Sequence, residues 1–202
     1  MEWVAELAGA AALVVTVVAV LPQTLRIVRV KSTAGVSPMW AMLGAISAGA
    51  WVAYTAARGL WWATVADALS CLVYVAAVAV LGRNGVRPRY LAGALWLCVL
   101  ALSFIVGGLS GLGAGLAFAF LVQVTPSIWT AYRTRDLMAA SLTTWVLMLS
   151  EGALWGFYGL IKGDAAVIAF GLVAVLASLL MVLRLAWWSA ARRSPELADQ
   201  RA

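Results

Sequence analysis

Two carboxyl side chains fall deep inside long apolar stretches of the chain, where an ionisable group needs a chemical reason. Asp67 and Glu151 have mostly apolar neighbours, whereas Asp136 falls in a polar break and Asp164 at a predicted helix start. The sequence has no histidine, and no lysine or arginine falls at a comparable depth. A carboxylate in apolar surroundings is unfavourable unless it faces water, finds a partner or takes up a proton. We therefore expect both acids to face a wet cavity and to exchange protons, with a local hydrogen bond near Ser150 as the alternative for Glu151.

Two tryptophans, Trp51 and Trp155, also lie well inside apolar stretches, 104 residues apart. An indole ring can stack on the apolar face of a sugar ring or attract a cation. Ser47 precedes Trp51 at the spacing at which Glu151 precedes Trp155, which makes Ser47 a candidate for the same pocket wall. The alternatives are indole rings that pack or face lipid, and a serine that bonds its own backbone.

Three prolines are candidates for hinges. Pro22 and Pro126 lie inside apolar stretches at equivalent places, and a proline within a helix removes one backbone hydrogen bond and leaves a kink. Pro38 is also typical of the first residue of a helix. The alternative for all three is a packing kink or helix start without movement.

The elements that must position these residues are membrane-spanning helices. The chain has 202 residues, 65% hydrophobic and only 11% charged, with a mean hydropathy of +0.99. A water-soluble domain carries roughly 25% charged residues, so most of these apolar side chains must face lipid. Lipid-exposed backbone must be helical or a closed barrel, and the long unalternating stretches favour helices. The predicted fold class is an all-α polytopic membrane protein.

Seven segments are each long enough for the roughly 20 residues that a crossing needs. The weakest division falls at Gly107–Gly111. The predicted spans are 4–27, 38–57, 60–82, 90–108, 111–132, 141–160 and 164–188.

The basic residues predict the orientation. With the N-terminus outside, all but two of the 14 lysines and arginines lie on the cytoplasmic face, the exceptions being Arg58 and Lys162. Short loops are oriented by their lysine and arginine content, so we expect a cell-membrane protein with the N-terminus outside and the C-terminus in the cytoplasm.

An internal repeat organises the spans. An offset of 104 aligns Pro22 with Pro126 and Trp51 with Trp155. Each copy covers three spans, so one additional crossing is needed to keep the two copies parallel. Two parallel repeats around a central site are typical of transporters. We expect a first three-helix bundle at 1–84, a linker helix at 85–109, a second bundle at 110–190 and a cytoplasmic tail at 191–202.

The first loop carries a family resemblance. The segment Leu21-Pro22-Gln23, followed by Arg26, Arg29 and the run from Lys31 to Ser37, resembles the first signature of the PQ-loop superfamily, which includes the SWEET and semiSWEET (MtN3/saliva) sugar transporters. The three-one-three helix plan looks like that of a SWEET. SWEET transporters also place a proline in the first two helices of each bundle, which Pro22, Pro38 and Pro126 match and Leu142 does not. Ser127 stands where a second glutamine is expected.

The resemblance implies a pocket with one tryptophan from the second helix and one asparagine from the third helix of each bundle. Trp51 and Trp155 match the tryptophans. Asp67 stands at the first asparagine position, and Phe170 with Gly171 at the second. The resemblance and the residues together predict a substrate site of Trp51, Asp67, Trp155, Phe170, Ser47 and Glu151.

The predicted function is a SWEET-like carrier of a small polar solute, with a mono- or disaccharide favoured, working by alternating access between the bundles. The alternative within transport is a proton-coupled carrier of an amino acid or another cationic solute, which Asp67 and Glu151 favour. The alternative of another class is a membrane receptor or sorting protein. We expect no enzyme activity, no metal and no cofactor, since no metal-ligand cluster and no nucleophile with a base is found. The lipid bilayer is the other partner, nucleic acid is not expected, and the sequence leaves oligomerisation open.

Overall fold

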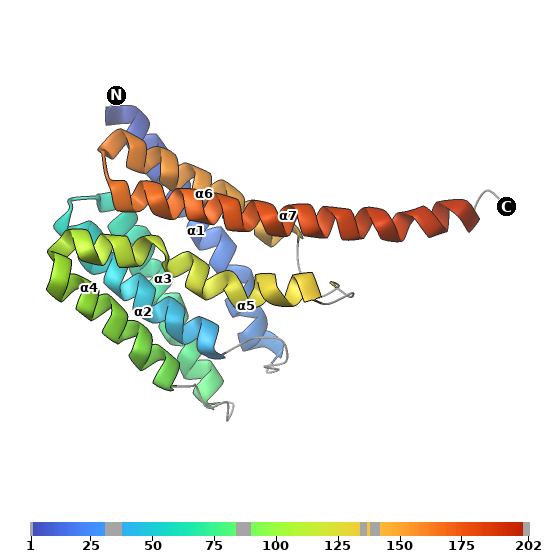
Figure 1. Ribbon diagram of the computed structural model, residues 1–202, viewed down its shortest axis with the longest axis horizontal. Coiled ribbons are helices and arrows are strands. Elements are labelled where there is room, and N and C mark those ends of the chain that lie inside the picture. The colour runs from blue at the N-terminus through green and yellow to red at the C-terminus, as the bar shows by residue number, and fades with distance from the viewer. Residues whose placement is uncertain (1, 31–37, 84–89, 134–136, 138–141, 200–202) are drawn as a thin grey trace.

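The computed structural model describes residues 2–30, 38–83, 90–133, 137 and 142–199, and it is helical almost throughout (Figure 1). Seven α-helices and no β-strand occur in these ranges. In chain order they are α1 (Glu2–Val30), α2 (Pro38–Ala57), α3 (Trp61–Arg83), α4 (Tyr90–Ala117), α5 (Ala119–Arg133), α6 (Leu142–Lys162) and α7 (Ala165–Asp199).

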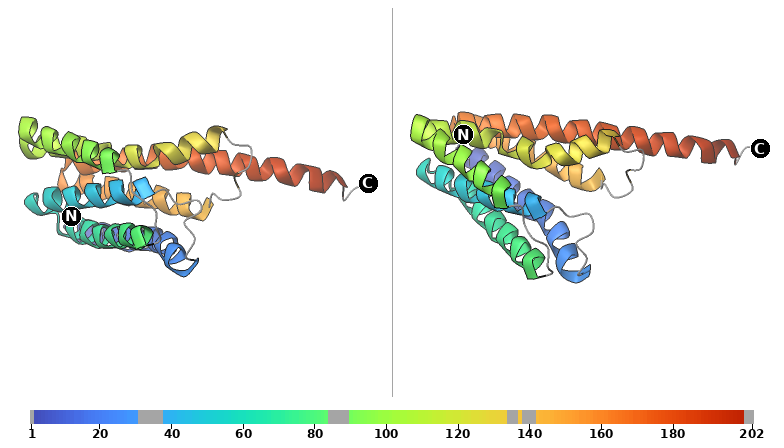
Figure 2. Two further views of the ribbon diagram at one scale, coloured as in Figure 1. Left: turned by 90° about the horizontal axis from the view of Figure 1, so that it is seen from below. Right: turned by 60° about the horizontal axis from the view of Figure 1, so that its bottom comes forward.

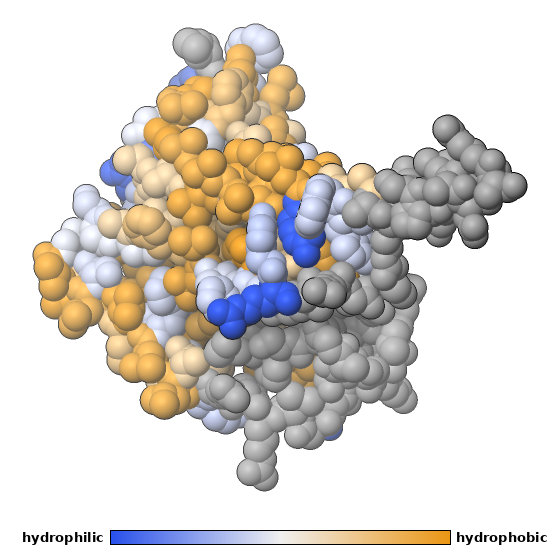
Figure 3. Space-filling view, turned by 45° about the vertical axis from the view of Figure 1, so that its right-hand side comes forward, coloured by the Kyte–Doolittle hydropathy of each residue, from blue (hydrophilic) through white to orange (hydrophobic). Residues whose placement is uncertain are grey.

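Hydropathy and exposure together identify a polytopic membrane protein, as predicted. Within the described ranges, four segments are long and apolar enough to cross a membrane: Glu2–Ala19, Trp61–Arg83, Tyr90–Thr125 and Ala165–Ala190. Large apolar side chains face outward, among them Ile105 at 76% and Val106 at 83% exposure. Figure 3 shows one face on which apolar side chains cover most of the coloured surface. Surface of this kind is stable against lipid and unfavourable against water.

The same packing order occurs twice along the chain. Helix α3 packs against both α1 and α2, and α7 packs against both α5 and α6. We call α1–α3 the first half and α5–α7 the second half. The halves meet where α1 contacts α6 and where α2 contacts α5. Figures 1 and 2 show successive helices running in alternate directions, so that α1 and α5 run the same way, as a parallel repeat requires.

A break inside α4 separates the predicted fourth and fifth spans. Gly108 has φ 57° and ψ −145°, outside the helical region, and Figure 1 shows the chain turning back at this end of the molecule. A positive φ is accessible to glycine at little cost because glycine has no Cβ. The division expected at Gly107–Gly111 is therefore a reversal at Gly108, and the returning stretch ends at Ala117 before α5 begins at Ala119.

Helix α7 runs well past the predicted end of the last span at residue 188. Its backbone continues as a helix to Asp199, so the first part of the segment expected to be a tail at 191–202 extends α7. Figure 1 shows this end of α7 projecting beyond the other helices.

Glycines allow α6 and α7 to pack backbone to backbone. A Cβ on Gly171 would lie 2.4 Å from Cα of Gly156 and 2.7 Å from the carbonyl oxygen of Gly152. A Cβ on Gly159 would lie 2.8 Å from the backbone nitrogen of Ile168. Small residues at such contacts let helices approach closely in membranes, where lipid gives no hydrophobic force between them. The contact between α6 and α7 therefore has no room for a larger residue.

Gly171→Ala should destabilise the protein, because its methyl group meets backbone atoms that cannot rotate away. Overpacking of this kind costs about 1–3 kcal/mol. Gly82→Ala is the matched control, since nothing lies within 4 Å of an added Cβ there. The measurement is the melting temperature of each variant in detergent. Equal melting temperatures for the two variants would contradict the close packing of α6 on α7.

Candidate functional site

A cavity of about 100 Å³ lies between the two halves, and every helix except α4 contributes to its wall. The six residues predicted to bind substrate, Ser47, Trp51, Asp67, Glu151, Trp155 and Phe170, all line this cavity. Its other polar and large side chains are Thr16, Thr55, Ser70, Tyr74, Phe120, Gln123 and Met148. The structure thus brings the predicted residues together, and their role in binding remains a prediction.

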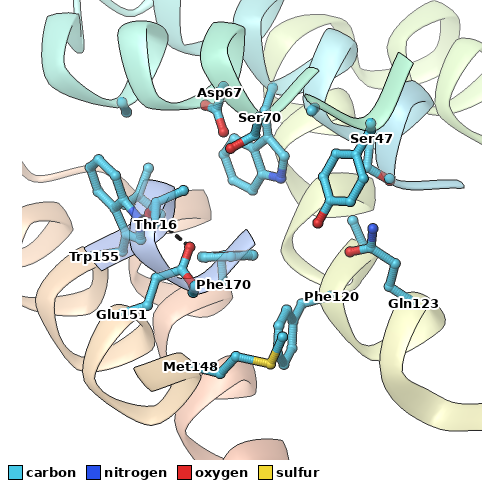
Figure 4. Close-up of a pocket in the computed structure, with 18 of the residues that line it drawn as sticks. Thr16, Ser47, Asp67, Ser70, Phe120, Gln123, Met148, Glu151, Trp155 and Phe170 are labelled. Atoms are coloured by element: carbon cyan, nitrogen blue, oxygen red, sulfur yellow. Dashed lines mark hydrogen bonds between the residues drawn. The ribbon is translucent and has the colours of Figure 1, made fainter. Parts of the chain in front are cut away.

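Asp67 and Glu151 contribute two carboxyl groups from opposite halves. Asp67 lies on α3 and Glu151 on α6, and they are near enough for their charges to repel each other (Figure 4). No lysine or arginine is among the described residues that line the cavity. Two enclosed carboxylates without a positive partner are strongly unfavourable, so the cavity favours a proton or a bound cation.

Thr16 connects Glu151 to Trp155 across the interface between the halves. The Thr16 hydroxyl donates to Oε1 of Glu151 at 2.8 Å and accepts from Nε1 of Trp155 at 3.1 Å. Thr16 belongs to α1 and is buried, whereas its two partners belong to α6. Sequence analysis missed Thr16, because its partners lie more than 130 residues away in the chain. The one feature of the sequence that could have indicated Thr16 is its hydroxyl group within an otherwise apolar stretch.

The two predicted indoles are buried at the cavity, at 7% exposure for Trp51 and 6% for Trp155, so neither faces lipid. Trp51 makes edge-to-face contacts with Phe170 at 5.4 Å between ring centroids and with Tyr54 at 5.6 Å. Trp155 makes the equivalent contact with Tyr158 at 5.6 Å. Aromatic rings thus form much of the apolar part of the wall.

The second half offers no acid at the position equivalent to Asp67. The repeat offset pairs Asp67 with Gly171, which lies in the close contact between α6 and α7. Its neighbour Phe170 lines the cavity instead. The close helix packing leaves no space here for the side chain that the resemblance implies.

Ser47 is buried in the wall, and its oxygen accepts a hydrogen bond from Nε1 of Trp96 on α4 at 2.9 Å. The alternative of a serine bonded to its own backbone is not what the structure shows. Gln123, in contrast, has a buried amide nitrogen without a hydrogen-bond partner in the described part of the chain.

A group of charged and polar residues joins the two halves next to the cavity, where it contacts the wall residues Trp51 and Val167. Asp164 accepts hydrogen bonds from the Tyr54 hydroxyl and from Nε of Arg58, each at 3.0 Å. It also accepts from the backbone N–H groups of Ala166 and Val167 at 3.1 Å, which makes it the N-cap of α7. The hydrogen bond and charge of Asp164 raise the pKa of Arg58, so the guanidinium stays charged. These contacts join the end of α2 to the start of α7.

A second, more exposed ion pair joins the halves at the same end. Nζ of Lys162 lies 3.3 Å from Oε1 of Glu6, and the indole N–H of Trp62 donates to Oε2 of Glu6. The side chains of Lys162 and Glu6 are 29% and 53% exposed, so this pair contributes little energy compared with the buried Asp164 contacts.

The hinge candidates fall within or at the start of helices. Pro22 lies inside α1, Pro126 inside α5, and Pro38 is the first residue of α2. Their side chains lie outside the described residues, and hinge movement remains a prediction. Within the described ranges, no group of three or more histidine, cysteine or acidic residues could hold a metal ion.

Comparison with known proteins gives one family match. The family described as "PQ loop repeat" matches residues 4–64, which cover α1, α2 and the start of α3. This segment contains Thr16, Ser47 and Trp51 of the cavity wall, and the match supports a place in the PQ-loop superfamily. No curated protein matches the chain.

Thr16→Val should destabilise the protein, because it leaves the Trp155 N–H without its acceptor and Glu151 without its donor. A buried polar group left unpaired costs about 1–3 kcal/mol. Thr125→Val is the control, since the Thr125 hydroxyl donates to Leu121 on an exposed helix face and its loss should cost under about 0.5 kcal/mol. Thermal unfolding in detergent measures both. A Thr16→Val variant as stable as Thr125→Val would show that the contact contributes nothing.

Proposed function

We propose that the protein is a carrier of a small polar solute that works by alternating access between its two halves. The observation that carries the proposal is the cavity itself, which is walled by both halves and lies next to contacts that join them. The PQ loop repeat match supports a transporter-like function. A rocking movement of one half against the other would expose such a cavity to each side of the membrane in turn.

The contacts of Tyr54, Arg58 and Asp164 are the candidate gate of this carrier. Beyond the Tyr54, Arg58 and Asp164 contacts lies a second hollow of about 400 Å³, whose wall includes Tyr54 and Arg58. In the proposed carrier, these contacts are the barrier between the cavity and this hollow. A solute passing this way must wait until the end of α2 and the start of α7 move apart.

The chemistry of the wall favours a solute that carries a positive charge. Asp67 and Glu151 supply two carboxyl groups, and the described lining has no basic side chain to neutralise them. The ring faces of Trp51 and Trp155 attract cations as well as C–H groups. An amine in this cavity would gain from both, whereas a neutral sugar would require the carboxyl groups to bind protons.

A sugar is the second candidate, favoured by the resemblance to SWEET transporters and by the paired indoles. The size of the cavity limits this candidate. One water molecule takes up about 30 Å³ in the liquid, so a cavity of about 100 Å³ is small. That space suits a solute no larger than a monosaccharide in the conformation that the structure describes.

Asp67→Asn should separate these two candidates, because asparagine keeps the size and hydrogen bonding of the side chain and removes its charge. For an amine, loss of a charged hydrogen bond of about 1.5–3 kcal/mol predicts binding weaker by roughly tenfold or more. Binding of a monosaccharide should persist. Ligand-induced thermal stabilisation across a panel of amines, amino acids and monosaccharides measures both outcomes. Glu2→Gln, which removes an exposed carboxyl at the start of α1, is the control.

The same variant tests proton exchange at Asp67. Wild-type uptake into vesicles should depend on pH, because the carboxyl must be neutral or paired in part of the cycle, and Asp67→Asn should lose the part of that dependence that Asp67 supplies. A variant with the wild-type pH profile would exclude Asp67 as the proton site and leave Glu151. Ligand binding without any flux in vesicles would favour a receptor instead of a carrier.

Asp164→Asn should make the proposed gate open more often, because it removes the charge that holds Arg58 and keeps the oxygen that caps α7. With Ser70→Cys as a reporter in the cavity and both native cysteines replaced by alanine, labelling by an impermeant thiol reagent should accelerate by about tenfold from the Asp164 side alone. Lys162→Gln, which breaks the exposed pair with Glu6, should change the rate by less than about twofold. Equal acceleration from both sides would contradict a gate at Asp164.

A further inference from the structure

Helix α4 is more than a connection between the halves, because one of its side chains reaches the wall of the cavity. Nε1 of Trp96 donates to Oγ of Ser47 at 2.9 Å, and Ser47 is 5% exposed. Helices α4 and α2 lie close together at this point. A Cβ on Gly93, one turn before Trp96, would lie 2.8 Å from Cε of Met42 and 3.2 Å from Cδ1 of Ile46. Gly93 therefore brings α4 near enough to α2 for the indole N–H to reach Ser47.

The bond from Trp96 determines what the Ser47 hydroxyl can still do. A hydroxyl has one donor and two acceptor sites, and an indole N–H only donates. Trp96 therefore occupies an acceptor site of Ser47 and leaves its O–H free to donate. Among the described residues, the structure gives that O–H no acceptor, and Ser47 lines the cavity. Figure 4 shows Ser47 on the opposite side of the view from Glu151 and Trp155.

The Ser47 donor complements the two acids. Asp67 and Glu151 accept hydrogen bonds and attract positive charge, whereas the Ser47 O–H requires an acceptor. A solute that satisfies all three carries a cationic nitrogen at one end and an oxygen at the other. An alkyl amine of the same size would leave the buried Ser47 hydroxyl unpaired, and an unpaired buried polar group is unfavourable.

We propose that Trp96 of α4 is a positioning residue that holds the Ser47 hydroxyl as a donor toward the solute, and that the carrier thereby selects amines that also bear an acceptor oxygen. This inference rests on the proposed carrier of a cationic solute. It adds the recognition of an oxygen at the other end of that solute. It assigns α4 a part in specificity, through a side chain that does not touch the solute.

The test is a double-mutant cycle read with two probes of equal size, ethanolamine and propylamine, which differ by a hydroxyl and a methyl group. Trp96→Phe removes the N–H donor and keeps an aromatic ring, and Ser47→Ala removes the hydroxyl. Each should weaken ethanolamine binding by roughly threefold to tenfold and change propylamine binding by less than about twofold. The double variant should bind ethanolamine no more weakly than Ser47→Ala alone, because Trp96 acts only through Ser47.

Trp61→Phe is the control, since Trp61 is 71% exposed and does not line the cavity, and it should leave both affinities unchanged. Equal losses for both probes in Trp96→Phe, or additive losses in the double variant, would overturn the inference and reduce Trp96 to a packing residue. If the wild-type protein binds neither amine, the cationic class itself is wrong, and the selectivity inferred from it is wrong too.

A measurement without ligand tests the contact separately. The indole N–H resonance of Trp96 in nitrogen-15-labelled protein should shift, and its proton should exchange faster with solvent, in Ser47→Ala than in wild type. An unchanged resonance would show that Trp96 does not hold Ser47 and would overturn the inference whatever the solute.

Discussion

The structure depends most on the enclosure of two carboxyl groups in a cavity whose described wall contains no basic side chain. Asp67 and Glu151 cannot both be ionised there without a positive charge from a proton or a solute. Because Asp67 belongs to the first half and Glu151 to the second, any change in their charge alters the force between the two halves. The occupancy of the cavity and the separation of the halves are therefore linked by electrostatics, which a purely apolar interface would not provide.

The two halves have the same arrangement of helices but contribute different side chains to the cavity. The repeat pairs Asp67 with Gly171 and Ser47 with Glu151, so each half supplies one acid, from its third helix in the first half and from its second helix in the other. The close packing of α6 on α7 explains the difference, because it takes the space that an acidic side chain at Gly171 would need. The second half thus has a tighter pair of helices, and its acid lies on α6.

The sequence predicted the parts of the fold and site that depend on local composition or on the repeat. Apolar length predicted the helices, the glycines near Gly108 predicted the reversal, and the repeat indicated Trp51 and Trp155. The sequence did not predict the roles of Thr16 and Trp96. Each is a single polar group in an apolar helix, and its hydrogen-bond partner depends on which helices pack against each other. The partners of Thr16 lie in α6 and that of Trp96 in α2, and no periodicity within one segment encodes such a pairing. The helical extension of α7 to Asp199 was missed for another reason, since its polar composition is typical of a tail.

In the proposed carrier, the contacts of Asp164 affect how fast the gate can open. Two backbone N–H groups of α7 hold its carboxylate whether or not Arg58 is bound, so opening displaces only the arginine and Tyr54. The Arg58 side chain is already 47% exposed, and water can hydrate it as soon as it leaves. Exposed side chains change rotamer in picoseconds to nanoseconds, whereas bundles of helices move in microseconds to milliseconds. The ion pair can therefore re-form almost as soon as the helices return, and the frequency of opening follows the movement of the helices instead of the breaking of one bond.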